Sequence, residues 1–339
     1  MKVLYVGADL SKNSFPCSIW VDGELIELGQ FENNQSGFKE LAIAVTSNQE
    51  KYGYDSVQII LESTGGYELH LLSFIHSQGW AFTLPNPKAV RDWAKGVGYR
   101  AKTDKVDGRI LSHYGGERRP KAQQPVPEII EQLDSLLQRQ EDTQKTLRQE
   151  LNRQHALSYH PNASACAFKS LERTIAFLES ELQQLKDDIA LLLKNNPELR
   201  TQSKQLLTVA GVGEKTVLPL LVMLHRFDAR TNGDGTGKQV TAYMGLDPKP
   251  FESGDTVWKR PSISKMGNSV MRSRLYLAAL GGVRGKKSPL RHFYLRLVER
   301  GKSKKLSLVA SARKILVWAW AIFKQGIEFD ASRLATSSN

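Results

Sequence analysis

Two apolar segments of this 339-residue chain end in an acidic residue, and this pattern limits the folds that the chain can adopt. The segment VLYVGAD ends at Asp9, and the segment VQIILE ends at Glu62. Runs of this length and composition predict buried β-strands. Because an ionised carboxylate is costly to bury unless it is paired or binds a metal, we expect both acids at accessible strand ends, where they can bind a cation.

Two further acids, Asp104 and Asp107, lie in the segment KTDKVDGRIL. They are three residues apart, so on a predicted helix they share one face. Each acid alone could instead cap a helix or a turn, but capping does not explain Glu62 at the end of an apolar strand. Hard divalent cations prefer oxygen ligands. We therefore predict a site for two Mg²⁺ ions, with Mn²⁺ as a possible substitute, whose ligands are Asp9, Glu62, Asp104 and Asp107.

Residues 1–122 alternate strand and helix patterns and are expected to form the first domain. Strands near residues 18–21 and 25–31 form antiparallel hairpins, and strand–helix units follow them. This order favours an α/β ribonuclease-H-like (RuvC-like) fold over a doubly wound nucleotide-binding fold. An actin-like ATPase also begins with a strand that ends in Asp, but the second phosphate loop and the adenosine motif of that fold are missing from the sequence.

Residues 123–200 change to a helical period and predict a coiled-coil or helical-hairpin insertion. Its second half spaces apolar residues alternately by four and three, and a polar helix precedes it before the break at His160-Pro161-Asn162. We expect this seam to act as a structural spacer and as an oligomer interface. The seam consists of Leu171, Ile175, Leu178, Leu182, Leu185, Ile189 and Leu192.

Residues 201–326 predict a third, mostly α-helical domain, and residues 327–339 a C-terminal tail. The turn at Gly211-Val212-Gly213 lies between two apolar helical runs, as in a helix-hairpin-helix motif whose backbone N–H groups bind a phosphate. Gly211, Gly213 and Lys215 are thus candidates for contacts with a nucleic-acid backbone. The alternative is an ordinary tight turn between helices.

Positive charge is concentrated near the C terminus. Residues 256–325 contain 17 Lys and Arg against a single acid, Glu299, which is a surplus of +16 in a chain of net charge +12. The remainder of the chain therefore carries −4. A local surplus of this size indicates a polyanionic partner, most often nucleic acid, although a solvated basic surface is the alternative.

Other classes of protein fit the sequence poorly. Gly237-Lys238 and Gly301-Lys302-Ser303 lack the earlier glycine of a phosphate-binding P-loop, and the seven histidines show no zinc spacing. His70, His76 and His225 are expected to be helix-face or packing residues. Two cysteines, no signal peptide and no apolar run of about 18 residues predict a cytoplasmic protein without a membrane segment.

Six segments in series resemble the DEDD transposases of the insertion-sequence-110 family, over nearly the whole chain. These relatives include a pilin-gene invertase and recombinases that are guided by a bridge RNA. The segments are GADLSK, LESTGGY, KTDKVDGRIL, GVGEKT, AYMGLDPKPFESG and SKMGNSVMRSRLY.

The resemblance implies a RuvC-like nuclease domain that carries the acids Asp9, Glu62, Asp104 and Asp107. It also implies a helical insertion and a transposase domain in which Ser253 is the nucleophile. A homo-oligomer, dimer or tetramer, with active sites shared between subunits is implied as well. The resemblance further implies a non-coding guide RNA and donor and target DNA as partners, and action at the bacterial nucleoid.

Several alternatives stay open from the residues alone. Ser253 could be an ordinary turn serine beside Gly254. The protein could be a RuvC-like endonuclease that hydrolyses branched DNA with water, or a non-catalytic nucleic-acid scaffold. Basic residues near Ser253 that could hold the scissile phosphate are Lys259, Arg260, Lys265, Arg272 and Arg274.

Overall fold

The computed structural model describes the backbone of residues 2–99, 104–253 and 257–331. Contacts divide the chain into two compact units. Unit 1 comprises Met1–Pro125 together with Ala229–Gly233, and unit 2 comprises Val126–Asp228 and Asp234–Asn339.

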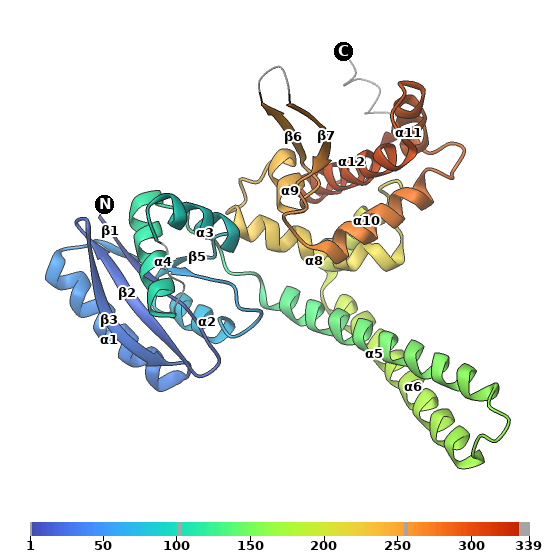
Figure 1. Cartoon of the computed structure of the whole chain (residues 1–339), viewed down its shortest axis with the longest axis horizontal. Coiled ribbons are helices and arrows are strands. Elements are labelled where there is room, and N and C mark those ends of the chain that lie inside the picture. Colours follow the sequence, from blue (N-terminus) through green and yellow to red (C-terminus); the bar gives the residue numbers. More distant parts are fainter. Residues whose placement is uncertain (1, 100–103, 254–256, 332–339) are drawn as a thin grey trace. The chain divides into compact units, whose positions relative to one another are not determined.

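A mixed β-sheet forms the centre of unit 1 (Figure 1). Within the described residues its strand order is β3-β2-β1-β4-β5, and β2 is antiparallel to both of its neighbours while β1, β4 and β5 are parallel. This order is consistent with the RuvC-like arrangement that the sequence predicts. The strands are β1 Val3–Ala8, β2 Ser14–Val21, β3 Glu24–Glu32, β4 Ser56–Leu61 and β5 Ala81–Thr83.

Helices cover both faces of this sheet. On one face, α1 (Gln35–Tyr52) and α2 (Leu69–Ser77) bury side chains such as Phe38 and Ile75 against the strands. On the other, α3 (Pro87–Gly96) and α4 (Asp104–Arg118) pack against Tyr5 and Ile60. The alternation of side chains along each strand sends consecutive residues to opposite faces, which is why Tyr5 and its neighbour Val6 belong to different clusters.

His113 of α4 lies in an aromatic cluster that holds α4 in place. Its ring stacks on Trp20 of β2 at 4.1 Å between centroids, and its Nδ1 lies 3.0 Å from the Tyr99 hydroxyl oxygen. Trp93 of α3 contacts the same ring edge-on at 5.0 Å. Burial lowers the pKa of His113, although Glu117 raises it in part. The cluster thus ties a helix of one face to a strand and to the neighbouring helix.

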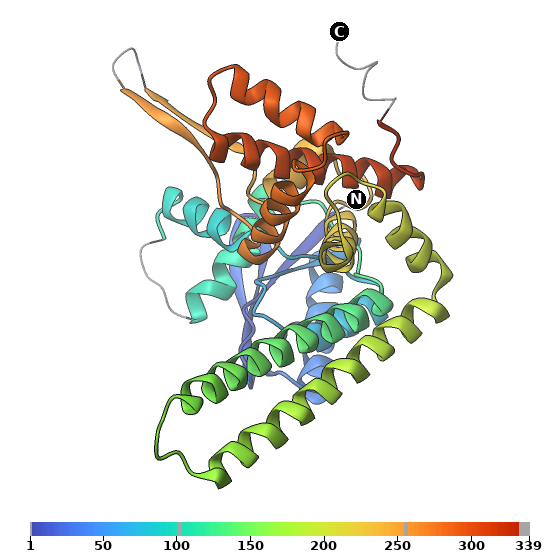
Figure 2. The same ribbon diagram turned by 90° about the vertical axis from the view of Figure 1, so that its right-hand side faces the viewer.

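Unit 2 begins with two long helices that form a hairpin, α5 (Glu128–Ser158) and α6 (Ala165–Asn195). They lie side by side in both views of the molecule (Figures 1 and 2). The predicted apolar seam of α6 is buried from Ile175 to Ile189 within this chain. Contacts within the chain therefore cover the middle of the seam, and the expectation that the seam also joins subunits stays a prediction.

The rest of unit 2 is mostly helical, with one β-hairpin. Ile130, Leu133 and Ile189 of the long hairpin belong to the same buried core as the later helices, so the segments on either side of residue 200 share one core. The later elements are α7 Pro197–Leu207, α8 Glu214–Arg230, α9 Gly237–Tyr243, β6 Pro248–Ser253, β7 Val257–Ile263, α10 Ser269–Gly282, α11 Pro289–Glu299 and α12 Lys304–Gln325.

Helix α12 is a core element of unit 2. In the described part of the chain it is the one helix whose length and composition would also allow it to cross a membrane, although the sequence contains no uninterrupted apolar run of about 18 residues. Yet 56% of its apolar window is buried, and Ile315, Leu316 and Ala319 are each fully buried. Packing against α10 and α11 therefore accounts for its apolar character.

Candidate functional site

Asp9 and Glu62 directly follow neighbouring parallel strands. β1 and β4 pair in register, with Ala8 opposite Leu61, so the two acids occupy the next position on each strand. Adjacent strands lie about 4.8 Å apart. Both side chains are partly buried, and that of Glu62 is 24% exposed. The carboxyl edge of the sheet therefore carries two adjacent acids, as the sequence predicts.

The first turns of α4 lie against the end of β1 because two glycines cross there. A Cβ atom on Gly7 would lie 2.2 Å from the Gly108 carbonyl oxygen and 2.3 Å from the Ser112 nitrogen. The buried Ser18 hydroxyl of β2 donates to the same Gly108 carbonyl at 3.0 Å. Asp107 precedes Gly108, so the partly buried Asp107 belongs to the region at the end of β1.

Asp104 begins α4, one helical turn before Asp107. Its side chain lies outside the described residues. Among the side chains that are described, no three Asp, Glu, His or Cys lie close enough together to hold a metal ion. The donor chemistry nevertheless fits Mg²⁺, because carboxylates from two strand ends and one helix start are hard oxygen ligands. The four-acid metal site thus stays a prediction.

Arg91 of α3 is the cation nearest to Glu62 for which the structure gives an ion pair. Its guanidinium lies 3.5 Å from the Glu62 carboxylate, and its side chain is 55% exposed. An ion pair this exposed contributes at most about 1 kcal/mol. Arg91 can therefore give up Glu62 to a bound cation at little cost.

Glu68 organises the loop that follows Glu62, and sequence reasoning missed it. Its side chain is buried and accepts hydrogen bonds from the Thr64 hydroxyl at 2.6 Å and the Gly66 N–H at 2.9 Å. It also accepts from Ser63 at 3.1 Å. Burial alone would raise the pKa of Glu68, but the bonds from Thr64 and from the backbone of Gly66 lower it overall. The available signal was an acid just beyond Ser-Thr-Gly-Gly.

Ser253 is the last residue of β6, in unit 2. It pairs with Val257, the first residue of β7, across residues 254–256, which lie outside the described residues. Lys259 and Arg260 belong to β7. The side chains of all three lie outside the description, so their predicted roles are untested.

Two of the predicted basic residues have partners within unit 2. Arg272 donates to the Gly267 carbonyl at 2.8 Å and to the Met244 carbonyl at 3.2 Å. Arg274 donates to Glu141 of α5 at 2.6 Å and to the Lys215 carbonyl at 3.0 Å. Both guanidiniums therefore stabilise contacts within unit 2. Their predicted contacts with DNA stay untested.

The predicted glycine turn lies between α7 and α8. Gly211 has a φ of +97°, and a Cβ there would lie 2.9 Å from Ile315 of α12 and 3.0 Å from the Ala278 carbonyl. Close packing thus explains Gly211, whereas the space around Gly213 is open.

The predicted Lys265 has a φ of +56°, in the turn that leads to α10. His225, expected to be a packing residue, lies 2.8 Å from Gln202 through its Nε2.

Comparisons with known proteins identify the family of this chain. A family model described as transposase, of the DEDD type of IS110, matches residues 6–160, and a model described as transposase of the IS116/IS110/IS902 family matches residues 203–295. The pilin gene-inverting proteins of Moraxella lacunata and Moraxella bovis are each 30% identical over 334 residues, which cover 97% of this chain and 98% of each relative. The chain, with its paired acids at the carboxyl edge of a mixed sheet, belongs to the IS110 family of transposases.

Proposed function

We propose that the protein is a site-specific DNA recombinase that cuts and rejoins DNA strands through a covalent bond between DNA and Ser253. The family membership supports DNA recombination in general. The observation that carries the proposal is the register of β1 and β4, which makes Asp9 and Glu62 neighbours beside the first turns of α4.

The four acids have one shared role in this proposal. Asp9, Glu62, Asp104 and Asp107 would bind two Mg²⁺ ions, which when bound stabilise the attacking and leaving oxygens of a phosphoryl transfer. Two of these acids follow buried strands, and two belong to the start of α4. Glu68 keeps the loop after Glu62 in one conformation.

Ser253 would act as the nucleophile. Its hydroxyl oxygen attacks the phosphorus of a DNA phosphodiester, and its proton passes to a base. The bond from phosphorus to the 3′ oxygen breaks, and that oxygen leaves as a 3′-hydroxyl after taking up a proton. The phosphoserine preserves the energy of the broken bond, so a 3′-hydroxyl of another strand can reverse the reaction without net hydrolysis.

The choice of DNA sequence would come from a non-coding guide RNA encoded by the same element. A protein that delegates sequence recognition to RNA needs mainly backbone contacts, which the basic C-terminal region suits. The same proposal includes a homo-oligomer with shared active sites that acts in the bacterial cytoplasm.

Covalent trapping tests the proposal. The protein, purified with its bound RNA, is incubated with Mg²⁺ and labelled DNA that carries the ends of its element. We expect a denaturation-resistant protein–DNA adduct that Ser253→Ala and Asp9→Ala abolish and that Ser273→Ala, on the exposed side of α10, leaves intact. Cut DNA without an adduct would indicate a hydrolytic nuclease, and unchanged DNA with every variant would indicate a scaffold.

A further inference from the structure

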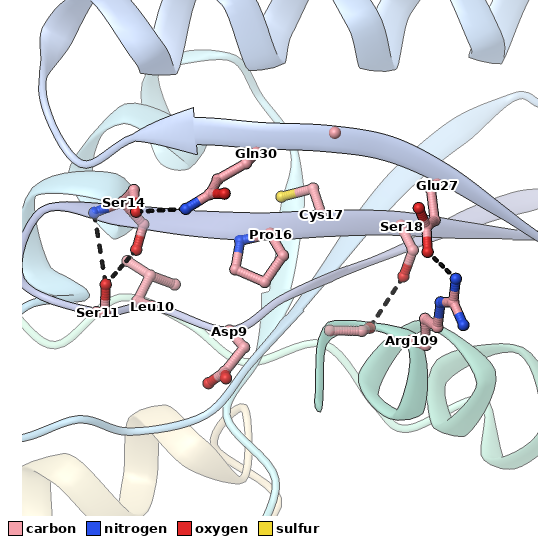
Figure 3. A pocket seen from close by; sticks show the side chains of 12 residues that line it. Asp9, Leu10, Ser11, Ser14, Pro16, Cys17, Ser18, Glu27, Gln30 and Arg109 are labelled. Carbon is pink, nitrogen blue, oxygen red and sulfur yellow. Dashed lines mark hydrogen bonds and ion pairs between the residues drawn. The ribbon is translucent and has the colours of Figure 1, made fainter. Parts of the chain in front are cut away.

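A groove beside Asp9 has no role in the proposed chemistry so far. It has a volume of about 520 Å³ and is bordered by the start of α4 and by β2 and β3. Ligand sites usually have volumes of about 300–1,000 Å³, so the groove can hold one nucleotide. Figure 3 shows Asp9 at one side of the groove and Arg109, directed at Glu27, at the other.

The groove combines a low apolar floor with polar side chains. Pro16 of β2 forms part of the floor. Gly29 of β3 adds no side chain, and the space above it is open, because a Cβ there would meet no atom within 4 Å. Above the floor, the Gln30 amide donates to the Ser14 hydroxyl at 2.7 Å. Such a surface suits the flat face of a sugar or base, with amide and hydroxyl groups at its edge.

Arg109 provides the positive charge of the groove. Its guanidinium forms an ion pair with Glu27, and the two side chains are 43% and 50% exposed. Exposed pairs of this kind contribute at most about 1 kcal/mol. Among the described residues, no group accepts a hydrogen bond from the buried Nε of Arg109. A guanidinium binds phosphate with two parallel hydrogen bonds, so a phosphate could replace Glu27 at the terminal Nη groups of Arg109.

We propose that the groove binds the nucleotide next to the scissile phosphate of the DNA strand, and that Arg109 leaves Glu27 to hold the phosphate of that nucleotide. The inference rests on the proposed function, because Asp9 at the border of the groove is one of the proposed metal ligands. Glu27 holds Arg109 at this end of the groove, in the position that the phosphate would take (Figure 3).

Equilibrium binding of a fluorescein-labelled single-stranded DNA 12-mer to the full-length protein tests this proposal. Divalent metal is omitted, so that no strand is cut. We expect Arg109→Gln to weaken binding about tenfold, because a charge-assisted hydrogen bond is lost. Arg109→Lys should recover part of that loss. Glu27→Gln should tighten binding, because it removes the competing carboxylate.

Two further variants separate a binding role from a structural one. The exchange Glu27→Arg with Arg109→Glu keeps an ion pair but moves the positive charge to β3, and we expect it to restore stability without restoring affinity. Lys51→Gln, on α1 at the opposite face of the sheet, is the matched control and should bind as the wild type does. If the exchange restores affinity, or if Arg109→Gln binds normally, the proposal is wrong.

Two further results would test other claims, and they can be distinguished from a failure of the groove proposal. Tighter, Arg109-dependent binding of an RNA 12-mer of the same sequence would assign the groove to RNA and overturn the DNA proposal. Failure of the wild type to form the covalent adduct would refute the proposed recombinase chemistry, whereas the binding series addresses the groove alone.

Discussion

At Gly7, a missing side chain determines where a helix can lie. The Gly108 carbonyl and the Ser112 nitrogen of α4 occupy the space that a Cβ would need. We expect Gly7→Ala to lower the free energy of unfolding by about 1–3 kcal/mol, because α4 must move away from β1 to make room for the added Cβ. Chemical denaturation measures this loss. Gly96→Ala, in α3 with no atom within 4 Å of the added Cβ, should cost nothing, and equal losses in both variants would contradict the argument.

At the scale of an element, the loop from Ser63 to Gly66 depends on the charge of Glu68. Because its pKa is lowered in the folded protein, its ionisation stabilises the fold above the pKa of the unfolded chain, about 4.3, and this stabilisation is lost as the pH falls through the folded value. We expect Glu68→Gln to destabilise the protein by about 1–3 kcal/mol at pH 7. The difference from wild type should shrink below about pH 4, as measured by urea denaturation at both pH values.

The matched control for that measurement is Glu40→Gln, in the middle of α1 and exposed to solvent. It should leave stability nearly unchanged at either pH. A constant difference between wild type and Glu68→Gln across the pH range would show that the shape of the side chain matters and its charge does not.

The elements that the sequence predicts best are those with a strong local pattern. The strands that end before Asp9 and Glu62 and the long helices of the hairpin follow from apolar spacing. The start of β2 at Ser14 was missed, because Pro16 argues against an interior strand. A register shift beside Cys17 accommodates it. Helix α3 was missed too, although Asn86 before Pro87 is an N-cap signal.

The candidate site was only partly predictable. The four acids follow from strand ends and from one helix face, which are local features. Glu68 and the pair Glu27–Arg109 do not, because their partners are set by tertiary structure: Arg109 is 82 residues from Glu27 in the chain. The seam of α6 shows the same limit, since spacing predicts an apolar stripe but not which helix covers it.

At the scale of the whole molecule, the proposed nucleophile and the proposed metal ligands belong to different units of the chain. If active sites are shared between subunits, an oligomer that mixes two defective chains contains intact sites. We therefore expect Asp9→Ala and Ser253→Ala proteins, each inactive alone, to recover part of the adduct formation when they are mixed and allowed to exchange subunits. If the mixture recovers no adduct formation, each chain uses its own metal ligands together with its own serine.

The segment after α4 closes one edge of the sheet of unit 1. Gln123 bridges to Phe82 of β5, and the buried Gln58 side chain donates to the Pro120 carbonyl at 2.8 Å. An uncovered edge strand invites pairing with other chains. A recombinant fragment of unit 1 that stops at Arg118 would therefore expose β5 and tend to aggregate in solution, so a truncation intended for biophysical work should retain the chain through Pro125.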